Sequence, residues 1–203
     1  ILESTGKKVG VIGTIGAVIG GVSEPTANTT PESYVLQQYF HRMAEAGCEY
    51  MVMEVSSQGL KMHRVDGIEF DYGIFTNISP DHIGPDEHAD FEEYLECKAM
   101  LFQRCKTGLF CADDEHVQRI MEKAACRCFT YGMEKAADFK VDEVNYVSDT
   151  NFVGVEFEVK GRYPVDVRVN IPGRFNVYNG LAAISLCSFL DLSRETLCHA
   201  LEH

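Results

Sequence analysis

Polar side chains follow the first two apolar segments of this sequence, at the points where buried strands would end. Asn28, Thr29 and Thr30 come after the first segment, and Glu54 and Ser56 follow the second. Ligands of open α/β sheets collect beyond the carboxyl ends of the strands. Amides and hydroxyls at the start of a helix suit an anion such as a diphosphate. A carboxylate at the end of an apolar strand calls for a charged partner or a metal ion.

Each of these groups also has a purely structural interpretation. Thr29 and Glu32 have the spacing of an N-terminal capping box. Glu54 could equally be held in a contact inside the protein. Arg64, ten residues after Glu54, is either a surface charge or a bidentate clamp for a phosphate or carboxylate. The spacing alone leaves both interpretations open.

A third cluster follows the next apolar segment and is dense in groups that can ligate metals. Its members are Asp81, His82, Asp86, Glu87 and His88. The spacing is not that of a zinc HExxH motif, so the cluster is either a site for a hard cation or a hydrophilic loop. Lys98 lies on the helix expected next, beside the apolar Cys97, and partial burial of its stem is therefore expected.

Alternating apolar runs and helical periodicity position these clusters. Strands are expected at residues 9–14, 50–55, 68–76 and 107–112, and helices at 32–46, 91–104 and 115–125. Residues 15–31 are rich in Gly, Thr and Pro and are expected to form an open loop. The alternation predicts an α/β fold with a mostly parallel sheet flanked by helices.

The pattern changes near Phe139. Strands are expected at 139–146, 152–160 and 163–171, followed by a helix at 176–190. We therefore expect three parts, namely an α/β core over 1–136, a small antiparallel β insertion over 137–172, and a C-terminal helix of the core over 173–203. Leu201–His203 are either native helix or the junction to a polyhistidine tag. Residues 1–8 resemble the last turn of a helix capped by Gly6, which suggests a trimmed chain.

The composition narrows the class of protein. The 203 residues carry a net charge of -13, which disfavours nucleic acid as a partner. An anionic substrate would need a local basic pocket or a divalent cation.

The eight cysteines show no paired CxxC pattern and are expected to be reduced thiols of a cytoplasmic protein. No signal peptide or membrane-spanning run is visible. Neither GxxxxGK[ST] nor GxGxxG occurs, so the chain lacks a phosphate loop.

Seven segments together resemble the Mur ligase family. They are Gly10–Gly16, Asn28–Glu32, Met53–Ser57, Arg64–Gly67, Phe75–Asn77 with Asp81-His82, Glu93-Tyr94 with Lys98 and Leu101-Phe102, and Gly173–Asn179. The resemblance runs from Lys7 to about Ala200 and is strongest to the MurE-type branch, which adds the third amino acid to a UDP-muramoyl dipeptide. It implies the central, P-loop-like domain of such a ligase.

The resemblance also implies roles for individual residues. The positions that match UDP-muramoyl substrate contacts are Asn28, Thr29, Thr30, Ser56 and Arg64. The positions that match magnesium ligands of the catalytic centre are Glu54, His82 and Lys98, the last as a carbamate formed with CO2. Asn176 and Asn179 match residues that contact the adenine nucleotide. The implied cofactor is Mg2+, and ATP is a substrate.

The implied reaction is ATP-dependent amide formation in peptidoglycan synthesis, and through it a role in cell shape and division. The substrate carboxylate attacks the γ-phosphate of ATP, and the amine of meso-diaminopimelate or L-lysine then attacks the acyl phosphate. Family members also carry an N-terminal and a C-terminal domain that this chain lacks, so the chain alone is expected to be inactive. Two alternatives stay open, namely a non-catalytic module that binds a muramoyl nucleotide or a metal, and a sister amide ligase of the folylpolyglutamate or cyanophycin type.

Overall fold

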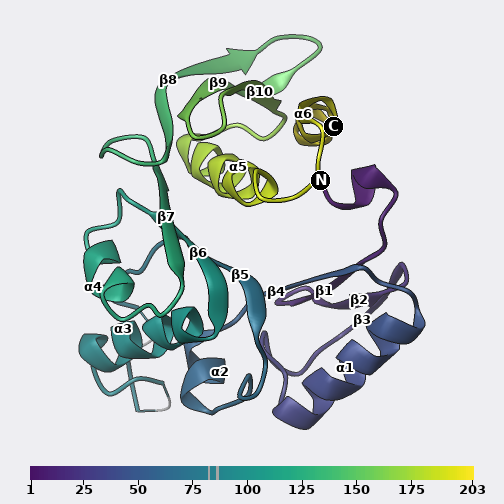
Figure 1. Ribbon diagram of the computed structural model, residues 1–203, viewed down its shortest axis with the longest axis vertical. Coiled ribbons are helices and arrows are strands. Elements are labelled where there is room, and N and C mark those ends of the chain that lie inside the picture. Colours follow the sequence, from purple (N-terminus) through teal and green to yellow (C-terminus); the bar gives the residue numbers. More distant parts are fainter. Residues whose placement is uncertain (82, 86) are drawn as a thin grey trace. The chain divides into compact units, whose positions relative to one another are not determined.

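The computed structural model describes residues 1–81, 83–85 and 87–203, so that His82 and Asp86 lie outside the described residues. The described chain forms two compact units. The N-terminal unit comprises Leu2–Glu69 and Pro80–Arg104, and the C-terminal unit comprises Ile1, Phe70–Ser79 and Cys105–His203. Figure 1 labels the helices and strands of both units.

The N-terminal unit contains a four-stranded sheet with the strand order β3–β2–β1–β4. The strands are β1 (Val9–Gly13), β2 (Gly16–Ile19), β3 (Val22–Glu24) and β4 (Tyr50–Met53). β1 and β4 pair in parallel, whereas β2 pairs antiparallel with β1 and with β3. The carboxyl ends of β1 and β4 therefore meet at one edge of this sheet, as expected for a strand-end site.

The expectation of an open loop over residues 15–31 is wrong in its first part, because β2 and β3 lie there. Gly20 and Gly21 have φ angles of 57° and 82°, which suit a two-residue turn between β2 and β3. Gly16 has a φ of 109°, and a Cβ at this position would lie 2.3 Å from the carbonyl oxygen of Glu24. The glycines that suggested a loop are the residues that permit two tight hairpins.

Helix α1 (Ser33–Glu45) buries one apolar side against this sheet. Leu36, Tyr39 and Met43 are buried at the spacing of three and four residues that marks a helix face. A Cβ on Gly10 of β1 would lie 2.3 Å from the sulfur of Met43. Glycine at this position lets helix and strand approach closely.

Short helices complete the N-terminal unit. They are η1 (Glu3–Thr5), α2 (Ser57–Lys61), α3 (Phe91–Met100) and η2 (Leu101–Gln103). Gly6 ends η1 with a φ of 79°, the left-handed conformation predicted for a C-cap glycine. α2 was not predicted, because five residues that include a glycine carry no helical periodicity.

The C-terminal unit contains a six-stranded sheet with the order β10–β9–β8–β7–β6–β5. The strands are β5 (Phe70–Phe75), β6 (Cys105–Cys111), β7 (Arg127–Gly132), β8 (Phe139–Ser148), β9 (Val153–Gly161) and β10 (Val165–Val169). β5 to β8 pair in parallel, and β8 to β10 pair antiparallel. The predicted α/β class with a largely parallel sheet and an antiparallel addition is confirmed.

Three helices belong to the C-terminal unit, namely α4 (Val117–Met121), α5 (Arg174–Cys187) and α6 (Arg194–Glu202). The antiparallel strands continue the parallel sheet, because Tyr131 and Gly132 of β7 pair with Phe139 and Lys140 of β8. The division of the chain at residues 136 and 172 stays a prediction. The structure assigns residues 201 and 202 to the last turn of α6.

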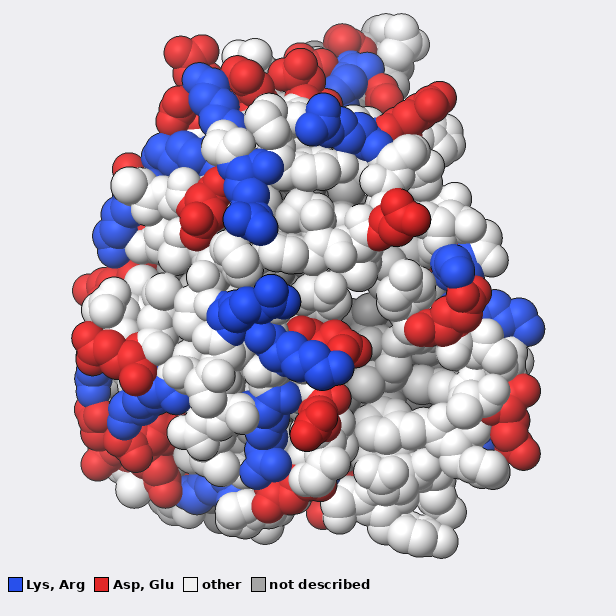
Figure 2. All heavy atoms as spheres, viewed as in Figure 1, with Lys and Arg blue, Asp and Glu red and all other residues white. Residues whose placement is uncertain are grey.

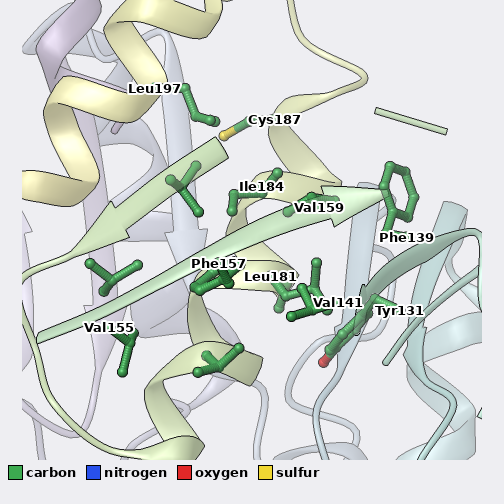
Figure 3. Close-up of a cluster of buried hydrophobic side chains, with 14 of the residues drawn as sticks. Tyr131, Phe139, Val141, Val155, Phe157, Val159, Leu181, Ile184, Cys187 and Leu197 are labelled. Carbon is green, nitrogen blue, oxygen red and sulfur yellow. The ribbon is translucent and has the colours of Figure 1, made fainter. Parts of the chain in front are cut away.

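The core of the C-terminal unit lies between α5 and the sheet. Figure 3 shows Leu181, Ile184 and Cys187 of α5 over side chains of β8 and β9, with Leu197 of α6 beside them. Burial of each such aliphatic side chain contributes about 1.5–3 kcal/mol. This core fixes the start of α5, where Asn176 lies.

Further properties concern the chain as a whole. All eight cysteines are free thiols, in agreement with the prediction of reduced cysteines. No described helix is long and apolar enough to cross a membrane. Figure 2 shows acidic and basic side chains interspersed on the displayed face, so the net charge of -13 does not make that face uniformly acidic.

Candidate functional site

Glu54 directly follows β4, and its carboxylate is held against the end of β1. Its Oε2 atom accepts hydrogen bonds from the Thr14 hydroxyl at 2.7 Å and from the Thr14 backbone N–H at 3.1 Å. A Cβ on Gly13 would lie 2.9 Å from the Glu54 carboxyl carbon. The Thr14 and Thr29 hydroxyls are 3.3 Å apart. Glu54 is exposed, so a hydrogen-bonded carboxylate is presented at the strand ends.

Thr30 is the buried centre of the neighbouring contacts, with no solvent exposure. Its hydroxyl donates to the Glu54 carbonyl oxygen at 3.0 Å and accepts from the Ser56 N–H at 2.8 Å. The Ser56 hydroxyl in turn accepts from the Gly59 N–H at 3.0 Å and caps α2. Both hydroxyls are thus used inside the protein, where they fix the segment that follows β4.

Arg64 connects this cluster to the start of α1. Its side chain is only 13% exposed, and one Nη atom lies 2.7 Å from the Glu32 carboxylate. The other Nη donates to the Thr30 carbonyl oxygen at 3.1 Å. Its Nε is buried and has no hydrogen-bond partner among the described residues. Arg64 is therefore partly buried and bound to groups of the protein itself rather than a surface charge, and its role as a clamp for a ligand stays a prediction.

The capping box considered for Thr29 and Glu32 is wrong. α1 begins at Ser33 with Glu32 as its N-cap, and Glu32 makes no side-chain cap hydrogen bond. The first N–H groups of a helix have no intrahelical partner and favour an anion. Asn28 is exposed just before this helix start, and Thr29 is half-buried.

Lys98 lies on α3 in the same unit and is half-buried, as its position beside Cys97 predicted. Its Nζ lies 5.1 Å from the centroid of the Tyr94 ring. Burial raises the pKa of Tyr94 to about 12, and the neighbouring Asp81 carboxylate adds to the shift. The lysine ammonium is thus packed on an aromatic face.

The residues that the resemblance implies as magnesium ligands fit the ion only in part. Glu54 offers the hard carboxylate oxygen that Mg2+ prefers. Lys98 as an ammonium would repel the ion and fits only as a carbamate, and His82 lies outside the described residues. No group of three His, Cys, Asp or Glu side chains suited to a metal exists among the residues that the structure describes.

The metal-ligand interpretation of the segment 81–88 does not extend to His88. This histidine is 1% exposed, and its Nε2 lies 2.9 Å from the Ser57 hydroxyl oxygen. Asp81 and Glu87 are exposed, and Asp86 is outside the described residues. His88 is a packed histidine within the N-terminal unit.

Asn176 and Asn179 lie on the first turns of α5 in the C-terminal unit. The Asn176 amide donates to the Pro172 carbonyl oxygen at 2.9 Å, and the Asn179 amide donates to the Asn176 oxygen at 3.3 Å. Gly173, at the N-cap with a φ of 108°, provides no side-chain cap. The two amides are held as a pair beside this helix start.

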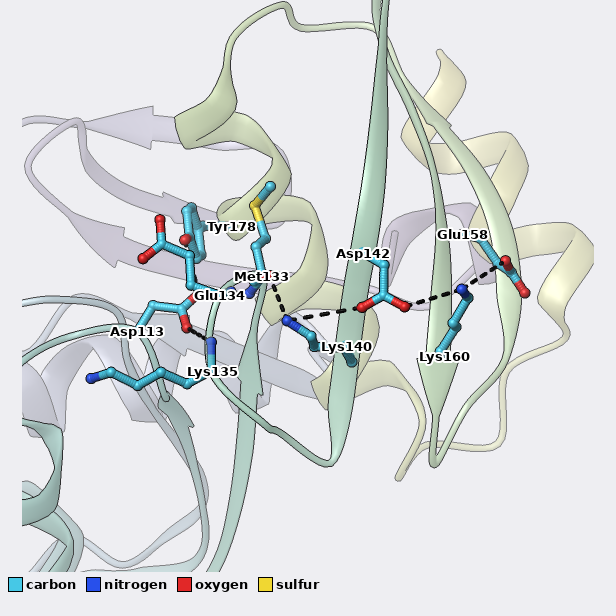
Figure 4. Close-up of polar contacts among 9 residues, drawn as sticks. All are labelled: Asp113, Met133, Glu134, Lys135, Lys140, Asp142, Glu158, Lys160 and Tyr178. Atoms are coloured by element: carbon cyan, nitrogen blue, oxygen red, sulfur yellow. Dashed lines mark hydrogen bonds and ion pairs between the residues drawn. The ribbon is translucent and has the colours of Figure 1, made fainter.

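Asp113, just after β6, was missed by sequence reasoning. Its carboxylate accepts from the N–H groups of Met133, Glu134 and Lys135 at 2.6, 3.0 and 2.7 Å, and from the Tyr178 hydroxyl at 2.8 Å (Figure 4). Burial alone would raise the pKa of Asp113, but these donors hold it below its ordinary value. Asp113 ties the turn after β7 to α5.

A positional signal could have found Asp113, and also Thr14, which is not among the site residues that the sequence predicts. Thr14 and Asp113 each stand one or two residues beyond a strand that has parallel neighbours, where ligand-binding groups collect in α/β sheets. Thr14 is a single polar residue in a Gly-rich context, whereas Asp113 begins the polar run Asp113–His116. The partners of both residues are distant in the sequence.

The fold and the polar strand ends define an α/β domain of the kind that binds ligands at the edge of its sheet. The family model described as the Mur ligase middle domain matches residues 1–187, and the chain belongs to this family.

Two relatives carry the name UDP-N-acetylmuramoyl-L-alanyl-D-glutamate–2,6-diaminopimelate ligase. The one from Caldanaerobacter subterraneus subsp. tengcongensis is 39% identical over the whole of this chain and 41% of its own length. A ligase of the same name from Geobacillus kaustophilus is 36% identical over 99% of this chain and 42% of its own.

Solved structures agree with this assignment. A structure of a UDP-N-acetylmuramoyl-L-alanyl-D-glutamate–2,6-diaminopimelate ligase superposes with a TM-score of 0.85 and 25% identity, covering 99% of this chain and 41% of the other. The UDP-N-acetylmuramate-alanine ligase of Thermotoga maritima shares the fold with a TM-score of 0.64 and 17% identity, over 99% of this chain and 39% of its own. The chain spans about two fifths of the length of the relatives that it matches.

Proposed function

We propose that the full-length protein is an ATP-dependent ligase that adds the third amino acid to UDP-N-acetylmuramoyl-L-alanyl-D-glutamate during peptidoglycan synthesis. The relatives named above join 2,6-diaminopimelate to this dipeptide according to their names, and diaminopimelate is the amino acid that we assign. L-lysine is the alternative amine.

The observation that carries the proposal is the continuous hydrogen-bonded network at the strand ends of the N-terminal unit. It runs from Thr14 and Glu54 through Thr30 to Ser56 and Arg64. It places a carboxylate, a guanidinium and an uncapped helix start in one unit. An acidic protein that binds a polyanion requires such a combination of local cation and amide donors.

In this proposal the chain's own residues bind and orient the reactants. The start of α1 with Asn28 and Thr29 binds anionic groups of the UDP-muramoyl substrate, and the Arg64 guanidinium, which is paired with Glu32 in this structure, lies beside this helix start. Thr30 and Ser56, whose hydroxyls are occupied, shape this pocket through the backbone that they fix. Asn176, which is half-buried, and Asn179, which is exposed, contact the adenine nucleotide through their side-chain amides.

Glu54, Lys98 as a carbamate, and His82 would hold Mg2+. Bound there, the ion would neutralise the charge that gathers between the ATP phosphates and the substrate carboxylate. Thr14 orients the Glu54 carboxylate through two donors to Oε2. The carbamate converts Lys98 from a cation into an oxygen ligand, which removes its repulsion of the metal.

The test is a ligase assay on the full-length protein with UDP-N-acetylmuramoyl-L-alanyl-D-glutamate, ATP and Mg2+. meso-Diaminopimelate and L-lysine are offered separately, and the product is identified by mass spectrometry. We expect tripeptide product and ADP with diaminopimelate, and none from the Glu54→Gln variant. The 203-residue chain alone should produce none.

Two results would contradict the proposal. Product formation with a folate and glutamate, but not with the muramoyl dipeptide, would make the protein a sister ligase. Micromolar binding of the muramoyl dipeptide by calorimetry without any product would make it a binding module.

A further inference from the structure

One buried histidine joins two helices of the N-terminal unit. The His88 Nε2 atom lies 2.9 Å from the hydroxyl oxygen of Ser57, the first residue of α2. The backbone of His88 pairs with Ile83 in a parallel bridge, and its carbonyl oxygen accepts from the Gly84 N–H at 3.0 Å. Its ring centroid is 5.1 Å from that of Tyr94 on α3. His88 thus contacts α2, α3 and the segment between them.

A carboxylate faces the other nitrogen of this imidazole. The Glu93 Oε2 atom lies 3.7 Å from the His88 Nδ1 atom. The same oxygen accepts from the Lys61 ammonium at 2.9 Å and from the Ala89 N–H at 2.7 Å. The hydrogen bond from Lys61 lowers the pKa of the Glu93 carboxyl, so this group is ionised at neutral pH. The imidazole thus has the Ser57 hydroxyl on its Nε2 side and the Glu93 carboxylate on its Nδ1 side.

Serine, histidine and a carboxylate in this order also occur in hydrolases, where the serine is a nucleophile. Here Ser57 is only 7% exposed, and no substrate carbonyl could reach its hydroxyl without displacing the helix. The contact of 3.7 Å between Glu93 and His88 is also longer than a hydrogen bond. The arrangement orients a buried ring rather than activating a nucleophile.

The two helices that His88 joins lead to two residues of the proposed ligase site, Ser56 and Lys98. Ser56, which caps α2, donates its N–H to the Thr30 hydroxyl at 2.8 Å. On the other side, the Tyr94 ring that His88 contacts also carries the Lys98 ammonium, 5.1 Å from its centroid. A displacement of His88 would therefore move Ser56 and Lys98 relative to one another.

We propose that His88 is a positioning residue that holds the start of α2, beside Ser56, in register with α3, which carries Lys98. Its contribution to catalysis rests on the proposed ligase function, whereas the coupling of the two helices does not. Lys61 of α2 adds a second link between the helices, because its ammonium donates to the Glu93 carboxylate of α3 at 2.9 Å. It also donates to the Glu87 carbonyl oxygen at 2.8 Å.

The test compares three substitutions in the full-length protein. His88→Leu removes both ring nitrogens at similar volume, and His88→Gln restores a polar atom near the Nε2 position. His41→Leu is the matched control, because His41 lies on α1 in the same unit with a side chain that is 74% exposed. Ligase kcat and KM are measured well below the melting temperature of each variant, and amide hydrogen exchange is followed over α3.

We expect His88→Leu to lower kcat by about 10- to 100-fold, the range for residues that orient ligands of a site. Amide exchange in α3 should become faster, His88→Gln should recover most of kcat, and His41→Leu should change neither.

Wild-type kcat in His88→Leu, or a loss that His88→Gln shares fully, would overturn the proposal. An inactive wild-type protein would refute the ligase function instead. The helix coupling would then stand if α3 exchange rises only in His88→Leu, and it would fail if exchange is unchanged.

Discussion

The Asp113 carboxylate offers the sharpest test of the structural reasoning. Asp113→Asn keeps the shape of the side chain but removes its charge and one acceptor. Of the four donors to Asp113, the Lys135 N–H is bound by Oδ1, and those of Met133, Glu134 and Tyr178 are bound by Oδ2. An asparagine can accept three of them at most, and its NH2 group then faces the fourth donor.

The expected cost follows from these contacts. A hydrogen bond to a charged group contributes about 1 kcal/mol more than a neutral one, so three bonds weaken by about 3 kcal/mol in total. We halve this value because Asp113 is half-buried. The mismatched Lys135 N–H adds about 1 kcal/mol. The sum of about 2.5 kcal/mol corresponds to a fall in Tm of about 5–10 °C for a chain of this size.

The assay is thermal unfolding of the 203-residue chain at several pH values. The donors lower the folded pKa of Asp113, so its contribution is present above the unfolded pKa of about 3.9 and is lost as the pH falls through the folded pKa. The difference in Tm between wild type and Asp113→Asn should therefore be full at pH 7 and should shrink below about pH 4.

The matched control is Asp71→Asn, because Asp71 is an exposed aspartate of the same unit whose ion pair with Lys106 is also exposed. Its Tm should change little. A Tm for Asp113→Asn within about 1 °C of wild type at pH 7, or a difference that grows on acidification, would refute the reasoning.

Three further predictions concern the two units. Thr14→Val removes the hydroxyl that donates to Glu54 at 2.7 Å and should lower ligase kcat about tenfold, measured by ADP release. Arg64→Lys cannot keep two separate Nη contacts and should raise KM for the muramoyl dipeptide about 10-fold or more. Gly154→Ala would place a Cβ 2.1 Å from the Val169 carbonyl oxygen and should destabilise the chain by about 1–3 kcal/mol, measured by denaturant unfolding.

Each of these predictions has its own control. Thr14→Ser keeps the donor and should keep most of kcat. A change in kcat rather than KM for Arg64→Lys would argue against substrate binding. Gly84→Ala meets no atom within 4 Å and should unfold at the wild-type denaturant concentration. An equal loss in both glycine variants would contradict the steric explanation.

The sequence predicted the strands and helices whose apolar residues repeat regularly. α1 is one example, since Leu36, Tyr39 and Met43 recur with helical spacing. The antiparallel strands β8 to β10 are another, because alternation of period two is a local property of the chain. The sequence predicts a loop where β2 and β3 lie, because glycine supports both tight hairpins and open segments, and only pairing with β1 distinguishes the two. α2, α6 and β7 were not among the predicted elements, although α4, which is as short as α2, was.

For the site, too, the sequence predicted only what depends on local residue types. The residue types at the strand ends by themselves allowed an anion site near Asn28 and an oxygen ligand at Glu54, but they allowed purely structural roles for the same residues equally, because a carboxylate that ends an apolar strand needs a partner of either kind. The hydrogen-bond partners of these residues come from distant parts of the chain and could not be predicted from the spacing of residues in the sequence. Thr14 lies 40 residues from Glu54, and Tyr178 lies 65 residues from Asp113.

Tertiary structure also bears on interpretations that the sequence left open. The cluster that contains His88 was expected to be either a site for a hard cation or a hydrophilic loop, and the burial of His88 beside Ser57 fits neither expectation. Thr29 could have capped α1, but the helix begins one turn later, at Ser33. The physical reason is the same in both cases. Local spacing determines which elements form and which face is apolar, whereas burial and hydrogen-bond partners depend on which distant segments pack together.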